Sequence, residues 1–233
     1  MQKKPLQTLK PLANIRANNM NPNPSEHIVK SYEDELMELT RLISELGGRV
    51  EQAIINATTA LTRVDHELAR QVVLDDRKVD EIQRLIDDTA VSMIARRQPM
   101  AADLRKIVAS IHVATDLERI GDMAKNIARR TLEINGQRLA PQLYSGVKHI
   151  SEMAMTQIKK ALDAVVALDV PAAILVVQAD RDVNALYMSL FREFLTYMME
   201  DPRNITDCTH LLFCAKNLER AGDHATNIAE AAY

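Results

Sequence analysis

The sequence has few aromatic residues, only two cysteines and no tryptophan. Aromatic residues make up 3 % of the 233 positions, so Ala, Leu, Ile, Val and Met have to fill the core, a composition typical of closely packed helices. Cys208 and Cys214 lie on one expected helix and point about 120° apart, so they cannot form a disulfide within that helix. The chain does not open with a signal segment, and its longest apolar stretch, 161–179, is interrupted by Asp and Pro and is too short to span a membrane. We therefore expect a cytoplasmic protein.

Several sequence motifs are also absent, and each absence excludes a class of function. The chain contains no GxxxxGK[ST], GxSxG, HExxH or CxxC motif, so nothing indicates nucleotide hydrolysis, acyl transfer or thiol chemistry. No candidate nucleophile remains, and we expect a protein that is not an enzyme. The formal net charge of −3 and the pI near 6.1 argue against general nucleic-acid binding. Proteins and cations are the expected partners.

The apolar residues recur at helical spacing. From Ser31 they repeat every three or four positions, which predicts a helix of about thirty residues. No segment alternates with a period of two, so we predict an all-α fold without a sheet. The fold class is two tandem three-helix bundles built from six long antiparallel helices. The five later helices are predicted at about 65–97, 100–134, 141–168, 171–199 and 202 to the end of the chain.

Three segments organise the chain. Residues 1–27 hold four prolines and no sustained apolar period, which predicts a flexible N-terminal arm. The first three-helix bundle is expected over residues 28–137 and the second over residues 138–233.

A sequence repeat joins the two expected bundles. LERIGDMAKNIA begins at Leu117 and LERAGDHATNIA begins at Leu218, and nine of their twelve positions are identical at an offset of 101 residues. Each copy places a Glu, an Asp and an Asn at successive fourth positions, so the three side chains share one stripe of a helix. The stripe residues are Glu118, Asp122 and Asn126 in the first copy, and Glu219, Asp223, Asn227 and Glu230 in the second copy, where the first copy has Arg129 instead of Glu230.

Both copies contain features that disfavour an isolated helix. Like charges four positions apart cost about 0.2–0.5 kcal/mol. Gly121 and Gly222 each cost about 1 kcal/mol relative to Ala in a helix interior. Because a glycine has no Cβ, we expect a neighbouring helix to approach closely at these two positions.

The second helix of each half offers a matching acidic pair. Asp76 and Asp80 are four apart, and the corresponding residues of the fifth helix are Asp180 and Asn184. If the second and third helices pack antiparallel, their four carboxylates converge into an all-oxygen set that suits Mg, Mn, Fe or Ca. His224 lies about 100° around the helix from Asp223, which favours a place beside such ligands over direct ligation.

A plainer interpretation of the stripes stays open. A Glu and an Asp four apart usually form a solvated helix face, and Arg119, Lys125 and Arg129 stand nearby as charge partners. The repetition and the matching pairs favour a cation site, but duplication without metal explains the repeat as well.

The two motifs resemble the signature of the PhoU family. The resemblance rests on NLERAGDHATNIAE at 217–230 and DLERIGDMAKNIA at 116–128, and extends to ELGGRVEQAI, DDRKVDEI and QPMAADLRKI, so that it covers about Glu26–Tyr233. It implies two tandem three-helix bundles and a cytosolic accessory regulator. Such a regulator restrains a phosphate ABC transporter through its ATPase subunit and helps a phosphate sensor histidine kinase to repress the starvation response. The resemblance also implies a homodimer that is peripheral to the membrane through its protein partners.

The resemblance further implies bound metal, because some members of the family bind multinuclear clusters through E(D)xxxD motifs. A divalent or trivalent cation, Fe, Zn, Mn or Mg, is expected. The implied ligands are Asp76, Asp80, Glu118, Asp122, Asp180, Glu219 and Asp223, with Asn126, Asn184, Asn227, Glu230 and His224 beside them.

Two other functions compete with this interpretation. A metal-free helical scaffold or adaptor fits the same composition. A carboxylate-bridged di-metal enzyme would need Glu-x-x-His on two helices, and no Glu-x-x-His occurs in the sequence.

Overall fold

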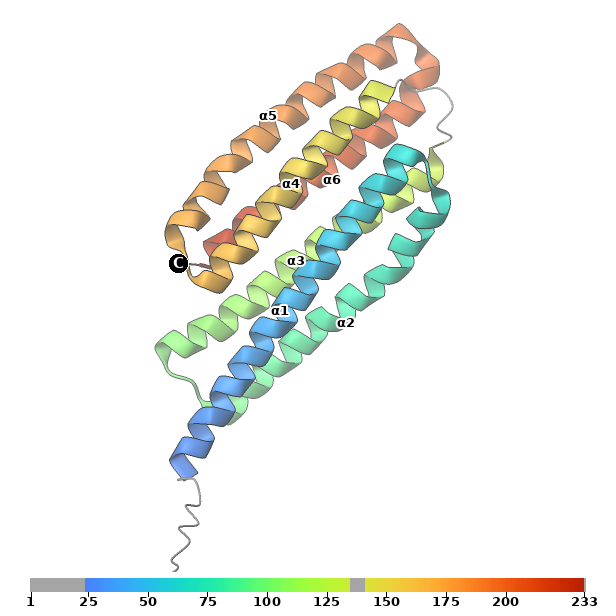
Figure 1. Cartoon of the computed structure of the whole chain (residues 1–233). Coiled ribbons are helices and arrows are strands. Elements are labelled where there is room, and N and C mark those ends of the chain that lie inside the picture. Colours follow the sequence, from blue (N-terminus) through green and yellow to red (C-terminus); the bar gives the residue numbers. More distant parts are fainter. Residues whose placement is uncertain (1–23, 135–140, 233) are drawn as a thin grey trace, which may run out of the picture.

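The structure is a computed structural model that describes residues 24–134 and 141–232, with side chains from residue 32. All described elements are helices, which confirms the predicted all-α fold of two three-helix bundles. The first bundle consists of α1 to α3 and the second of α4 to α6 (Figure 1). The elements are α1 Pro24–Arg63, α2 His66–Arg97, α3 Ala101–Glu133, α4 Pro141–Ala167, α5 Val170–Glu200, the short 3-10 helix η1 Pro202–Asn204 and α6 Ile205–Glu230.

The start of α1 differs most from the expected helix bounds. The other bounds agree within three residues, but α1 begins at Pro24, seven residues before Ser31. Proline is well tolerated at the first position of a helix, and a leading turn needs no apolar stripe, so periodicity gives no signal there. The arm expected over 1–27 therefore includes the first turn of α1, and residues 1–23 lie outside the described residues.

The turn within each half is built in the same way. The residue before the cap, Val64 or Leu168, has a positive φ of 51° or 52°, which ends the preceding helix. An Asp then caps the next helix: Asp65 accepts hydrogen bonds from the backbone N–H groups of Glu67 and Leu68, and Asp169 accepts one from Ala172. These repeated caps make α1 antiparallel to α2 and α4 antiparallel to α5.

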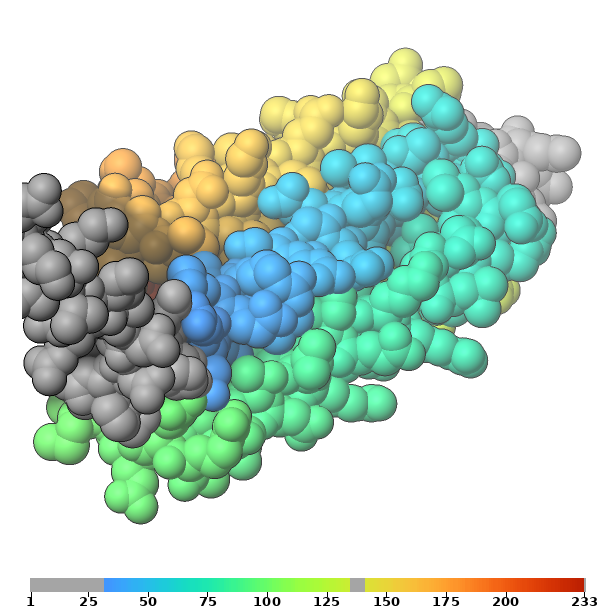
Figure 2. Space-filling view, turned by 60° about the horizontal axis from the view of Figure 1, so that its bottom comes forward, coloured from blue at the N-terminus to red at the C-terminus, as the bar shows by residue number. Residues whose placement is uncertain are grey.

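The two bundles lie side by side along their length. α3 packs on α6 and α1 packs on α4, whereas α2 and α5 lie on the outside (Figure 1). Figure 2 shows α1 between α2 and α4 on one face of the molecule. A Cβ on Gly47 would lie 2.7 Å from Leu162 Cδ1, so this glycine lets α1 and α4 approach. A buried 2.8 Å hydrogen bond between the Thr58 and Ser151 hydroxyls also joins them.

The core runs continuously through both bundles and is built mainly of aliphatic side chains with two buried aromatic rings, Tyr144 and Phe194. None of the described helices combines the length and the apolar character needed to cross a membrane.

Candidate functional site

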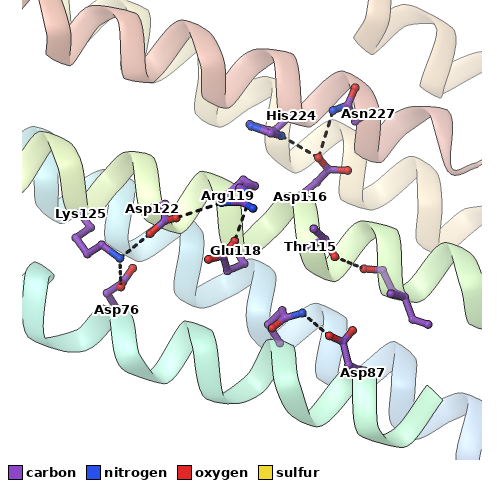
Figure 3. Close-up of polar contacts among 12 residues, drawn as sticks. Asp76, Asp87, Thr115, Asp116, Glu118, Arg119, Asp122, Lys125, His224 and Asn227 are labelled. Atoms are coloured by element: carbon purple, nitrogen blue, oxygen red, sulfur yellow. Dashed lines mark hydrogen bonds and ion pairs between the residues drawn. The ribbon is translucent and has the colours of Figure 1, made fainter. Parts of the chain in front are cut away.

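The first acidic cluster, Asp76, Asp80, Glu118 and Asp122, lies between α2 and α3. Lys125 stands one turn after Asp122, and its ammonium donates to Asp122 Oδ1 and to Asp76 Oδ2, each at 2.5 Å. Figure 3 shows this side chain reaching from α3 toward α2. The ammonium therefore links two of the predicted ligands across the helix pair.

The carboxylates of the first cluster affect one another. Burial raises the pKa of Asp76, although the hydrogen bond and charge of Lys125 oppose this, and Asp80 and Asp122 raise it further. Burial, together with the charges of Asp122 and Asp80, raises the pKa of Glu118. The charges of these four carboxylates therefore act on one another across α2 and α3.

Lys125 remains a cation in this setting. Burial alone lowers the pKa of its ammonium, but the hydrogen bonds to Asp122 and Asp76 and the charges of these two carboxylates together outweigh burial, so the pKa is raised. Its side chain is only 17 % exposed. A positive charge is therefore fixed inside the first acidic cluster.

Gly121 sets the distance between the two helices that carry the first cluster. A Cβ at this position would lie 3.0 Å from Val79 Cγ1 on α2. The close approach that the sequence predicted for this glycine is present, and it brings the acidic side chains of α2 and α3 within reach of each other.

The second acidic cluster, Asp180, Glu219 and Asp223, lies between α5 and α6. Glu219 is 7 % exposed and its Oε2 lies 2.5 Å from the ammonium of Lys216. Asp180 accepts hydrogen bonds from the amide of Asn184 at 2.6 Å and from the amide of Gln157 at 3.3 Å. Two of its three carboxylates therefore already have partners.

Asp223 is the open member of the second cluster. Burial and the charges of Glu219 and Asp180 raise its pKa, while Lys216 and His224 oppose the rise. Among the described residues, none donates a hydrogen bond to its carboxylate. This carboxylate is available to a cation.

Gln157 of α4 belongs to the second cluster and was missed from the sequence. It is 3 % exposed, its Oε1 is buried without a hydrogen-bond partner among the described residues, and a Cβ on Gly222 would lie 3.0 Å from that oxygen. A polar residue within the buried stripe formed by Ala154, Ile158 and Ala161 was the signal that could have found it.

The five residues predicted to lie beside the metal ligands have different surroundings, and only some of them lie near a predicted ligand. Asp116 Oδ1 lies 2.8 Å from His224 Nδ1 and accepts from the Asn227 amide at 3.2 Å, so both residues of α6 face α3 of the other bundle (Figure 3). Glu230 is exposed at the end of α6, and Asn126 is half-buried on α3. Asn184, as described above, contacts the predicted ligand Asp180 directly.

The two clusters differ in how well they fit a metal ion. Within residues 24–134 and 141–232, no group of three His, Cys, Asp or Glu side chains is placed to hold one as arranged. In the first cluster, Lys125 contacts two of the four candidate ligands and a metal would have to displace it. In the second cluster, Lys216 contacts one of the three candidate carboxylates, Glu219, while Asp223 and Gln157 Oε1 have unused oxygen lone pairs. The second cluster is the better fit.

Comparison with known sequences gives a consistent result. A family model described as the PhoU domain matches residues 43–131 and again residues 147–232. A phosphate-specific transport system accessory protein PhoU homolog from Rhizobium meliloti is 50 % identical over 89 % of this chain and 87 % of that protein. One from Caulobacter vibrioides is 46 % identical over 88 % of this chain and 90 % of that protein.

Solved structures show the same architecture. The crystal structure of PhoU from Pseudomonas aeruginosa superposes with a TM-score of 0.82 at 39 % identity, covering 86 % of this chain and 96 % of that one. The phosphate transport system regulatory protein PhoU from Streptococcus pneumoniae superposes with a TM-score of 0.80 at 27 % identity, covering 86 % and 94 %.

Proposed function

The chain belongs to the PhoU family, a family of accessory proteins and not of known enzymes, and from this premise we propose that it is a cytosolic regulator of phosphate uptake and phosphate-starvation signalling. The observation that carries the proposal is the 50 % identity, over nearly the whole chain, to a phosphate-specific transport system accessory protein homolog. The regulator restrains the phosphate ABC transporter and keeps the sensor histidine kinase in its repressing state when phosphate is plentiful.

The proposed partners are the ATPase subunit of the transporter and the sensor kinase. Long helical faces suit such a role, because they offer extended surfaces for proteins without a catalytic centre. Each of the six described α-helices carries at least one exposed large apolar side chain, which supports docking by surface contact. We also propose a homodimer, to be tested by sedimentation velocity.

A binding assay tests the regulatory proposal. Immobilised wild-type chain should retain the ATPase subunit or the cytosolic part of the sensor kinase, and the amount retained should differ between high and low phosphate. A chain that binds neither protein in either condition would contradict the proposal.

We propose further that a metal cation, Fe, Zn, Mn or Mg, binds at the acidic motifs, and that the second cluster binds it in preference to the first. The open carboxylate of Asp223 and the unpartnered oxygen of Gln157 support the second cluster, whereas Lys125 competes for the first. A bound cation there would neutralise the negative charge of Asp223 and tie α6 to α5.

Metal analysis of matched variants tests the metal proposal. Protein purified without chelator should lose its metal in Glu219→Gln/Asp223→Asn and keep it in Glu118→Gln/Asp122→Asn, as measured by mass spectrometry of the elements. Metal-free wild-type protein would contradict any metal role, and equal loss in both variants would contradict the preference for the second cluster.

A further inference from the structure

An apolar groove crosses the junction of the two bundles. Its walls come from the first half of α1, the beginning of α3, the end of α4 and the residues just after α6, and it encloses about 550 Å³. These segments meet at the end of the molecule where α3 begins and the chain ends (Figure 1). We name it the junction groove; its apolar wall includes Leu36, Met37, Ile43, Val166 and Leu168.

The apolar wall of the junction groove is unusually exposed. Met37 of α1 is 61 % exposed, Val166 of α4 is 55 % exposed, and Leu168 just after α4 is 58 % exposed. Isolated exposed apolar residues are common, but a contiguous apolar surface along a groove marks a binding site.

The charges on the junction groove all have one sign. Its charged lining residues are Arg105 and Lys106, at the start of α3, and no Asp or Glu lines it. Neither cation forms an ion pair or a side-chain hydrogen bond with a described residue, although the chain as a whole carries a net charge of −3. The groove therefore offers two cations that no described residue pairs with, beside an apolar floor.

Charge complementarity selects among the possible occupants. A symmetric dimer through this groove would bring Arg105 and Lys106 of both copies together, because the same patch faces itself in such an interface. Residues 1–23 of the chain carry three lysines and one arginine and no acidic residue, so they are repelled as well. A lipid surface is flat, whereas the apolar residues here line a concavity. An acidic partner segment remains.

We propose that the junction groove binds an amphipathic helix of a partner protein that carries carboxylates beside an apolar stripe. The groove follows α1 from Leu36 to Ile43, about 10 Å, which matches two turns of a docked helix with apolar anchors at i, i+3 or i+4, and i+7. The carboxylates of this helix pair with Arg105 and Lys106. Both bundles contribute to the groove, so the docked helix holds them together. The proposal rests on the regulatory function proposed above and identifies the surface that performs it.

Two groove variants test the apolar and the charged contribution separately. Val166→Glu places a charge on the exposed apolar wall, and Arg105→Glu/Lys106→Glu reverses the rim. Each has a matched control on another surface: Val91→Glu, at a position 60 % exposed on α2, and Lys159→Glu/Lys160→Glu, an exposed neighbouring pair on α4. All four changes are at exposed positions, so circular dichroism should show folded proteins.

The probes are the purified ATPase subunit and the cytosolic part of the sensor kinase, with affinity measured by biolayer interferometry. For the partner that binds wild type, we expect each groove variant to raise the Kd at least tenfold and each control variant to change the Kd less than threefold. Raising the salt concentration should weaken wild type more than Arg105→Glu/Lys106→Glu, because that variant lacks the attractive charges.

Other outcomes distinguish the occupants. If wild type binds neither probe, the regulatory function itself fails; if wild type binds and the groove variants bind equally well, only the groove proposal is overturned. Loss of a dimer in Val166→Glu, or binding of wild type to anionic vesicles that the variant abolishes, would assign the groove to a second copy or to lipid and overturn the proposal. If removal of residues 1–23 tightened partner binding while the groove variants had no effect, residues 1–23 and not the groove would control binding, and the groove proposal would be overturned.

Discussion

Replacing Lys125 with methionine is expected to lower the free energy of unfolding by about 2–3 kcal/mol at pH 7. The ammonium of Lys125 contacts Asp76 and Asp122 at 2.5 Å, and Asp76 is buried. Removing one partner from a buried ion pair leaves an uncompensated charge and costs about 3–5 kcal/mol, less here because Asp122 remains partly in water. Urea unfolding followed by circular dichroism measures the change.

The deficit of Lys125→Met should depend on pH with a definite sign. Without the ammonium, burial and repulsion raise the pKa of Asp76 in the folded state above its unfolded value of about 3.9. The loss of stability that the unpaired charge of Asp76 causes is fully present above the folded-state pKa of Asp76. It shrinks as the pH falls through that pKa and is gone below the unfolded-state pKa. The deficit should therefore be smaller at pH 4.5 than at pH 7.

Two further variants isolate the cause. Asp76→Asn/Asp122→Asn combined with Lys125→Met removes both charges as well as the cation, and should recover most of the lost stability. Lys216→Met, in the second half, removes a lysine that is 43 % exposed and contacts one carboxylate, Glu219, whereas Lys125 is 17 % exposed and contacts two, so Lys216→Met should cost less than Lys125→Met. Equal losses in Lys125→Met and Lys216→Met would contradict a special role for Lys125.

Replacing Gly121 with leucine is expected to lower the free energy of unfolding by about 1–3 kcal/mol. A Cβ here already lies 3.0 Å from Val79 Cγ1, and the branched valine has little freedom to move, so a leucine must push α2 from α3. The same displacement separates Asp76 from Asp122, so Lys125→Met should cost less in the Gly121→Leu background than in wild type.

Gly48 provides the control for a glycine in a helix interior. It is exposed on α1, and a Cβ there would meet nothing within 4 Å. Gly48→Ala should therefore raise the free energy of unfolding by about 0.5–1 kcal/mol through helix propensity alone. If Gly121→Leu were also neutral or stabilising, the close packing of α2 on α3 would not matter for stability.

The helix bounds illustrate what the local sequence predicts well. Apolar spacing located the six helices because it reports the face that each one buries, and Pro and Asp marked their starts at Pro141 and Asp65. It missed the first turns of α1, since a turn that buries no stripe leaves no period. It also missed Gln157, because whether a single polar residue in an apolar stripe faces a cluster depends on the neighbouring helices.

The sequence alone was sufficient for the repeat, the all-helical class and the acidic stripes, because these follow from periodicity along one chain. The difference between the two halves came only from the tertiary structure. The sequence offered Lys125 only as a nearby charge partner of the stripe on its own helix, and packing of α2 against α3 places it between Asp76 and Asp122. At the equivalent position α6 has Thr226, and the lysine that contacts the second cluster, Lys216, reaches Glu219 alone. The junction groove likewise exists only where the two bundles meet, because its walls come from segments far apart along the chain.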